Sequence, residues 1–190
     1  MTSVLARVMD RLDLAIEWLI RWDGETMLAI SEHPALRRLS WLFLAATHLG
    51  DGYLWGGLAL GLIVLGSPLD RAYVLIALAI SIINIAIFRL FKLLFERPRP
   101  MPIIMGLRSQ FIDSYSFPSG HATTAFGIVW VIAVHYPYLI YQLPAYFGAI
   151  TIAVSRVYLK EHFPLDVLSG ALLGSFVAAY LLPFFQRLFL

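Results

Sequence analysis

Apolar segments separated by short polar ones make up most of this 190-residue chain. Several of them approach or exceed the roughly 20 residues that a helix needs to cross a bilayer. A charged, proline-rich stretch over residues 92–117 cannot cross lipid. The expected spans are residues 41–65, 72–91, 119–136, 143–158 and 164–185. The pattern predicts an all-α polytopic membrane helix bundle with about five transmembrane helices.

The first 36 residues follow a different pattern, in which apolar side chains recur at helical spacing and charged ones fill the other faces. The apolar positions are Leu5, Val8, Leu12, Ile16, Leu19 and Ile20. Such an amphipathic helix suits a membrane interface, as do Trp18 and Trp22. A helix packed on the end of the bundle fits the pattern equally well. We expect a single domain over residues 1–190, with residues 1–36 as an N-terminal interfacial segment.

Composition supports lipid as the main solvent of the chain. It is 60% hydrophobic and 14% charged, whereas soluble domains are about half apolar and a quarter charged. A net charge of +2, with no block of like charges, excludes a nucleic-acid partner. The absence of cysteine excludes disulfides and thiolate metal sites. Charges throughout the first thirty residues also argue against a removable signal peptide.

The polar residues of the second half fall into three clusters. The first, residues 92–100, follows the second span, and the second, residues 118–121, opens the third span. The third cluster, residues 155–166, joins the fourth and fifth spans. Because each crossing changes sides, we expect all three clusters to meet at one membrane surface.

The groups gathered at this surface suit a tetrahedral oxyanion. Lys92, Arg99 and Arg156 would surround one point, and the arginine fork can bind two phosphate oxygens at once. Pro118 and Pro164 are each placed for the first turn of a helix. Both helix starts would then direct N–H groups and positive dipole ends to the same place. Phosphate is the expected ligand.

Two histidines supply reactive groups. His162 and Asp166 are four residues apart at a helix start, so they are expected to share one face. The carboxylate would fix the imidazole tautomer while the other nitrogen attacks. His121 could protonate the leaving alkoxide and later activate water. No acidic cluster is available to hold a metal, so the cations would stabilise the transferring phosphoryl group, and we expect no cofactor.

The three clusters resemble the signature of the type 2 phosphatidic acid phosphatase (PAP2) superfamily, which also includes vanadium haloperoxidases and acid phosphatases. The signature is Lys-x6-Arg-Pro, then Pro-Ser-Gly-His, then Ser-Arg-x5-His-x3-Asp. This chain matches it in order and without a substitution over residues 92–166.

The resemblance implies a role for each matching position. His162 would form a phosphohistidine that Asp166 orients, and His121 would act first as general acid and then as base. The residues that would hold the phosphate are Lys92, Arg99, Ser119, Gly120 and Arg156. Family members are similar in needing no metal.

Other polar residues are left outside the expected site. Arg97 belongs to a second Arg-Pro pair and is excluded only by its spacing in the motif. Arg89 suits snorkelling toward the headgroups, and His33 and His135 suit hydrogen-bonded packing. Ionisable residues within spans are often functional. For Asp51, however, the glycines on both sides fit a helix break near the opposite surface, and we leave it out of the site.

A site at a lipid surface points to a lipid substrate. Apolar residues flank the motifs at 101–107 and at Phe111 and Phe117, so a lipid phosphate could enter sideways from the bilayer. Polyprenyl diphosphate, phosphatidylglycerophosphate, phosphatidic acid and lipid A phosphates all fit. The same residues would serve a lipid-to-lipid phosphotransferase. The intact motifs argue against a non-enzymatic membrane protein, and oligomeric state is left open.

Two arguments about the side of the membrane that the site faces disagree. Five of the 14 Lys and Arg residues precede the first span and seven lie on the catalytic side, between Arg89 and Lys160. The positive-inside rule applied to that count places the site in the cytoplasm. At least three of these cations belong to the expected site, however, and the resemblance implies an outward-facing site. We expect a multi-pass protein of the cytoplasmic membrane with an extracytoplasmic site.

Overall fold

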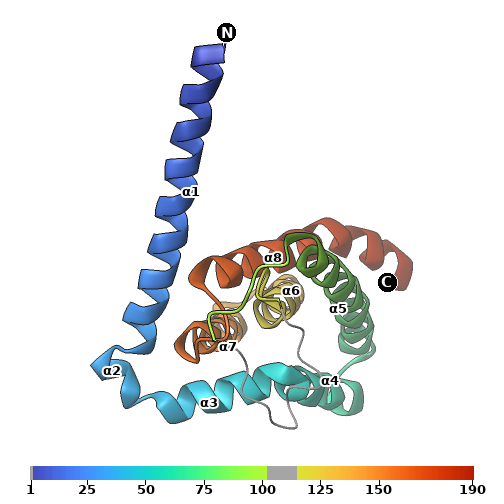
Figure 1. Cartoon of the computed structure of the whole chain (residues 1–190). Coiled ribbons are helices and arrows are strands. Elements are labelled where there is room, and N and C mark those ends of the chain that lie inside the picture. Colours follow the sequence, from blue (N-terminus) through green and yellow to red (C-terminus); the bar gives the residue numbers. More distant parts are fainter. Residues whose placement is uncertain (1, 102–114) are drawn as a thin grey trace.

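The computed structural model describes residues 2–101 and 115–190 (Figure 1). The described elements are α1 (Thr2–Ser31), α2 (Pro34–Arg37), α3 (Ser40–His48), a π-helical turn η1 (Leu49–Tyr53), α4 (Leu54–Leu65), α5 (Pro68–Phe95), α6 (Gly120–His135), α7 (Leu139–Tyr158) and α8 (Pro164–Phe189). The prediction of an all-α bundle is confirmed. α6 lies at its centre, in contact with α5, α7 and α8.

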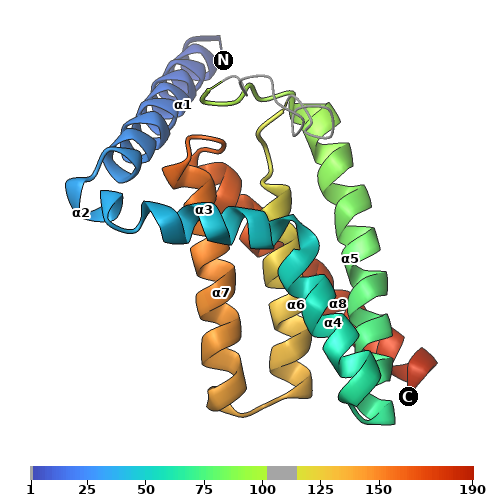
Figure 2. The same ribbon diagram turned by 90° about the horizontal axis from the view of Figure 1, so that it is seen from below.

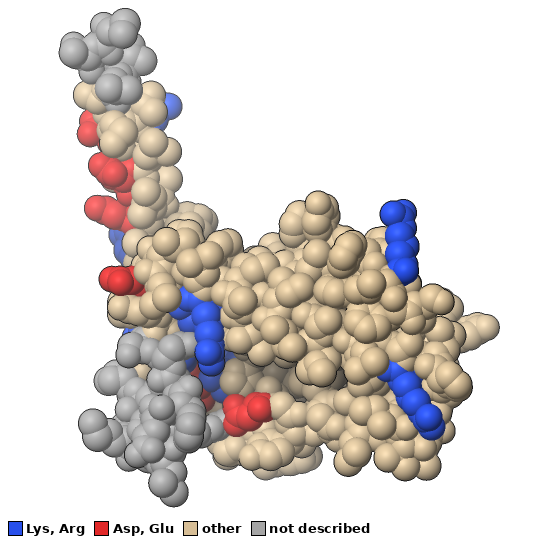
Figure 3. Space-filling model, turned by 90° about the vertical axis from the view of Figure 1, so that its right-hand side faces the viewer, with Lys and Arg blue, Asp and Glu red and all other residues tan. Residues whose placement is uncertain are grey.

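Three of the described helical segments are long and apolar enough to cross a membrane: Ser40–Leu65, which contains α3 and α4, then α5 and α8. α6 is apolar but shorter, at 16 residues, and α7 has 20 residues. These five segments correspond to the five expected spans. The face of the bundle in Figure 3 is largely uncharged, and apolar side chains such as Leu65 and Phe176 point outward. Such a surface suits lipid as solvent.

α1 projects from the bundle as one long helix (Figure 1). Apolar side chains of its first part, including Ile16, Trp18 and Ile20, are exposed, while acidic side chains line one side of it (Figure 3). Asp23 and Met27 are buried where the helix meets α7 and α8. The end of α1 therefore packs on the bundle, and its exposed apolar part stays a predicted membrane-interface surface.

α6 and α8 approach until their backbones touch. A Cβ at Gly174 would lie 2.0 Å from the carbonyl oxygen of Thr123, and one at Gly170 would lie 2.5 Å from that of Ser119. Small residues spaced four apart allow this approach between membrane helices. The backbone N–H of Ser119 donates to the carbonyl oxygen of Asp166 at 2.9 Å, which joins the starts of the two helices.

A polar cluster ties the helices together at the other end of the bundle. Ser67 and Asp70 form a capping box at the start of α5. Oδ1 of Asp70 also accepts hydrogen bonds from Nε2 of His135, at 2.6 Å, and from the Tyr136 hydroxyl. The His135 ring stacks on Tyr73. His135 is thus a hydrogen-bonded packing residue, as expected.

Candidate active site

The structure brings the three polar clusters together at one end of the bundle (Figure 2). Lys92 lies near the end of α5, and Ser119 and His121 lie at the start of α6. Arg156 lies near the end of α7, and His162 lies in the connection to α8. The groups thus come from the end of one helix and the start of the next, twice in succession. This is the arrangement that alternating membrane crossings predict.

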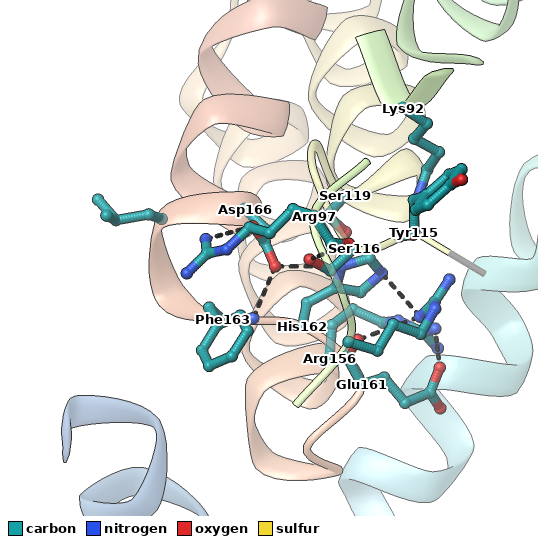
Figure 4. Close-up of polar contacts among 12 residues, drawn as sticks. Lys92, Arg97, Tyr115, Ser116, Ser119, Arg156, Glu161, His162, Phe163 and Asp166 are labelled. Atoms are coloured by element: carbon teal, nitrogen blue, oxygen red, sulfur yellow. Dashed lines mark hydrogen bonds and ion pairs between the residues drawn. The ribbon is translucent and has the colours of Figure 1, made fainter. Parts of the chain in front are cut away.

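His162 is buried between Asp166 on one side and Arg156 on the other (Figure 4). Its Nε2 lies 3.4 Å from Nη1 of Arg99, and its Nδ1 lies 3.7 Å from Oδ2 of Asp166. The second distance is an electrostatic contact and too long for a hydrogen bond. Burial, and then the charges of Arg156, Arg99 and Lys92, hold the pKa of His162 well below its usual range. The imidazole is therefore neutral at neutral pH and keeps the lone pair that a nucleophile needs.

Two details of the helix starts differ from the sequence-based expectation. α8 begins at Pro164, so His162 precedes the helix and meets Asp166 through the bend of the connection, not along one helical face. Pro164 does occupy the first turn, as expected. α6 begins at Gly120 with Ser119 as its N-cap, so Pro118 lies before the helix. The expectation for Pro118 was therefore wrong.

The three expected cations all reach the surroundings of His162. Nζ of Lys92 donates to the carbonyl oxygen of Tyr115 at 2.6 Å, and Nη1 of Arg99 donates to that of Glu161 at 3.1 Å. Arg156 is almost fully buried and forms an ion pair with the Glu161 carboxylate. These positively charged groups converge on a site that the protein itself partly neutralises with Glu161.

The start of α6 adds uncharged polar groups. Ser119 is fully buried, and among the described residues its Oγ and Nδ1 of His162 are buried without a hydrogen-bond partner. Buried polar atoms of this kind usually have a partner, which a bound ligand can supply. Gly120 packs on the ring of Phe88, where a Cβ would come within 2.9 Å. A phosphate oxygen near this helix start would also meet the positive end of its dipole.

The side chain of Arg97 points away from Nε2 of His162, which Arg99 faces, and toward two carboxylates. Its Nη1 donates to Oδ1 of Asp166 and its Nη2 to Oδ2 of Asp23, both at 2.6 Å. Asp23 is fully buried and also accepts from the backbone N–H of Leu165 at 2.9 Å. The Arg97 guanidinium lies 4.1 Å from the ring centroid of Phe163. Arg97 therefore supports the carboxylate behind His162, and links it to α1.

Sequence reasoning missed several of these groups. Thr47 and Glu161 both bind Arg156, and the pattern gave no signal for Thr47. Asp51 is another of these groups, because it binds His121. Its Oδ1 lies 2.8 Å from Nε2 of His121, so our placement of Asp51 near the opposite surface was wrong. The signal that could have found it was an ionisable side chain inside a span.

Metal ligands were not expected, and within residues 2–101 and 115–190 no group of three or more His, Asp or Glu is placed to hold a metal ion. The apolar residues expected beside the site at 102–107 and at Phe111 lie outside the described residues. That the protein needs no metal and no cofactor stays a prediction.

Comparisons with known proteins show the family of the chain. The PAP2 superfamily model matches residues 72–190, more than half of the chain. Decaprenylphosphoryl-5-phosphoribose phosphatase of Mycobacterium tuberculosis is 32% identical over 162 residues, covering 82% of this chain and 88% of that protein. A shorter match, 29% identical, spans 26% of mouse sphingosine-1-phosphate phosphatase 2.

Two solved structures share the fold. The structure of Aquifex aeolicus LpxE has a TM-score of 0.62 at 28% identity, over 84% of this chain and 93% of that one. A transmembrane PAP2-type phosphatidylglycerolphosphate phosphatase of Bacillus subtilis has a TM-score of 0.68 at 25% identity, over 89% and 87% of the two chains. Fold, site and relatives define a phosphatase built into the membrane. The chain belongs to the PAP2 superfamily.

Replacing Arg97 and replacing Arg99 are expected to affect catalysis differently. Arg99→Ala should abolish turnover, because Arg99 faces Nε2 of His162. Arg97→Ala should lower kcat about 10- to 100-fold with little change in KM, because it supports Asp166 and not the phosphate. Phosphate release by purified protein in detergent measures both. Arg89→Ala, at an exposed position of α5, is the control and should retain activity. Greater damage from Arg97→Ala than from Arg99→Ala would contradict this assignment.

Proposed function

We propose that this protein hydrolyses phosphate esters of membrane lipids through a phosphohistidine formed on His162. The observation that carries the proposal is the buried position of His162, with its Nε2 facing Arg99 and its Nδ1 facing Asp166. A histidine kept merely for packing would not need an arginine at one nitrogen and a carboxylate beside the other.

In the first step, Nε2 of His162 attacks phosphorus and the bond from phosphorus to the lipid oxygen breaks. His121 gives its proton to that oxygen, which leaves as the alcohol. Asp166 stabilises the positive charge that develops on the imidazole, and the 3.7 Å contact to Nδ1 can shorten to a hydrogen bond. Lys92 and Arg156, with Arg99, stabilise the phosphoryl oxygens.

In the second step, water replaces the alcohol. His121, now neutral, takes a proton from the water as its oxygen attacks phosphorus. The phosphorus–nitrogen bond breaks, the electron pair returns to Nε2 of His162, and inorganic phosphate is released. Both histidines then have the protonation states with which the cycle began.

An apolar groove supports a lipid substrate. It has a volume of about 330 Å³, lies between α4, α5 and α6, and is lined almost wholly by apolar side chains. One end reaches Gly52 and Thr124, the latter one helical turn from His121, and the other end reaches Tyr73 and His135. An apolar chain attached to the phosphate can lie in this groove while the phosphate occupies the site.

The relatives narrow the choice of lipid. The M. tuberculosis relative, which matches over most of both chains, is named for a phosphate on a polyprenyl-linked sugar. Shorter matches are named as a phosphatidylglycerophosphatase of B. subtilis and an undecaprenyl-diphosphatase of Sulfolobus acidocaldarius. We infer that polyprenyl-linked phosphates are the first class to test, ahead of phosphatidylglycerophosphate.

A panel of these lipids, each compared with a short-chain analogue that carries the same headgroup, tests the proposal. We expect phosphate release with kcat/KM at least about tenfold higher for the long-chain form. Burial of two methylene groups already provides that factor, at roughly 0.8 kcal/mol each. His162→Ala should release no phosphate from either form. Transfer of labelled phosphate to a second lipid, in place of release, would identify a phosphotransferase.

Two adjacent glycines of α4 provide a matched pair for the groove. Gly56 lines it and Gly57 does not, and a Cβ at either position meets nothing within 4 Å. Gly56→Leu should reduce the preference for the long chain, whereas Gly57→Leu should leave it unchanged. Equal effects of the two substitutions would show that the lipid chain does not lie in this groove. Phosphate release that persists in His162→Ala would contradict the proposed function itself.

We further propose that the site opens to the extracytoplasmic side of the cytoplasmic membrane. Because the chain has no cysteine, single cysteines report sidedness cleanly. Glu96 is exposed beside the site, and Tyr138 is 68% exposed in the α6–α7 connection at the other end. On intact cells, an impermeant thiol reagent should label the Glu96→Cys variant and not the Tyr138→Cys variant. The reverse pattern would place the site in the cytoplasm.

A further inference from the structure

The first span is broken at the level of the site. α3 ends at His48 and is joined to α4 by the π-helical turn η1. Within it, Gly52 has a φ of 118°, which glycine adopts without steric cost. π-helical turns and unusual backbone conformations are frequent at functional sites. The side chain that this break presents to the site is that of Asp51.

Asp51 and its neighbours are fitted to one imidazole ring. Oδ1 of Asp51 lies 2.8 Å from Nε2 of His121. Gly50 packs on the same ring, because a Cβ there would lie 3.0 Å from Cδ2 of His121 and 2.8 Å from Ile152. Gly50 therefore contacts the ring edge, Asp51 binds its nitrogen, and Gly52 permits the turn that places them.

Among the described charged groups near His121, Asp51 is the one that binds a ring nitrogen. Within the described part of the chain, the other charged groups that act on the ring are Arg156 and Glu161, which form an ion pair with each other. His48 lies 3.9 Å from the second carboxylate oxygen of Asp51 and is mostly exposed. A carboxylate on one imidazole nitrogen selects the tautomer with a proton there and stabilises the imidazolium form.

We propose that Asp51 is the positioning residue of His121, an inference that rests on the proposed function. With Nε2–H donated to Asp51, the proton that His121 transfers is carried on Nδ1. It passes to the lipid oxygen as the phosphorus–oxygen bond breaks. A proton returns to Nδ1 from the attacking water as the phosphorus–nitrogen bond breaks, and Asp51 stays ionised throughout. Asp51 precedes residue 72, where the match to the family model begins.

The test compares two small phosphate esters of similar size on one preparation of enzyme. Benzyl phosphate releases an alkoxide that needs a proton, whereas 4-nitrophenyl phosphate releases a phenolate that leaves without one. Asp51→Asn should lower kcat/KM about 10- to 100-fold for benzyl phosphate, within the range that a general acid contributes, and by no more than about threefold for the nitrophenyl ester. His121→Ala should show the same selectivity. The ratio of the two losses does not depend on the folded fraction.

Asp70 provides the matched control. Its Oδ1 lies 2.6 Å from Nε2 of His135, so the chain holds a second Asp–His pair at the end of the bundle away from the site. Asp70→Asn should lower thermal stability in detergent. The ratio of the two kcat/KM values should nevertheless remain that of the wild-type protein, because this pair does not contact the reacting groups.

An equal loss of kcat/KM on both esters in Asp51→Asn, or no loss on either, would overturn the positioning role of Asp51. The proposed function would still stand if the wild-type protein hydrolyses these esters and needs His162 to do so. If the wild-type protein releases phosphate from neither ester nor any lipid, and His162→Ala changes nothing, the proposed function fails and this inference fails with it.

Discussion

The close approach of α6 and α8 is the constraint on which the site depends. Gly170 and Gly174 let the two backbones touch, and a side chain at either position would force the helices apart. Because the helices meet along this line, the N–H of Ser119 reaches the carbonyl oxygen of Asp166. The start of α6, with its polar groups and dipole, is thereby fixed beside His162.

A second layer of charges controls the reactive histidines. Burial, and then the nearby cations, lower the pKa of His162. The cations would bind the phosphate, but a buried cluster of this kind is costly unless carboxylates offset it. Glu161 is paired with Arg156, and Asp166 is bound through Arg97 to Asp23. Each histidine also faces a carboxylate: His162 faces Asp166, and His121 faces Asp51. The N-terminal residues, outside the family match, supply two of these four carboxylates, Asp23 and Asp51.

The sequence predicted the bundle and the meeting of its three motifs, because hydropathy and the alternation of crossings determine both. Motif spacing singled out Arg99, which faces His162, but it could not predict that Arg97 binds Asp166 and Asp23, because those contacts depend on how the chain bends after α5. Asp51 was missed because a break in a span looks the same from the sequence whether it lies at the site or away from it. Asp23 looked like one more charge on an amphipathic helix, and only the packing of α1 on α8 reveals its burial.

The central claim is that His162 forms a covalent bond to phosphorus, and trapping that intermediate tests it most directly. Protein incubated with a lipid labelled in its phosphate should be quenched in alkali, which preserves phosphohistidine, and the labelled peptide identified by mass spectrometry. The account predicts phosphate on His162 in wild-type protein and none in His162→Ala. Sustained phosphate release with no phosphorylated His162, or with phosphate on another residue, would contradict it.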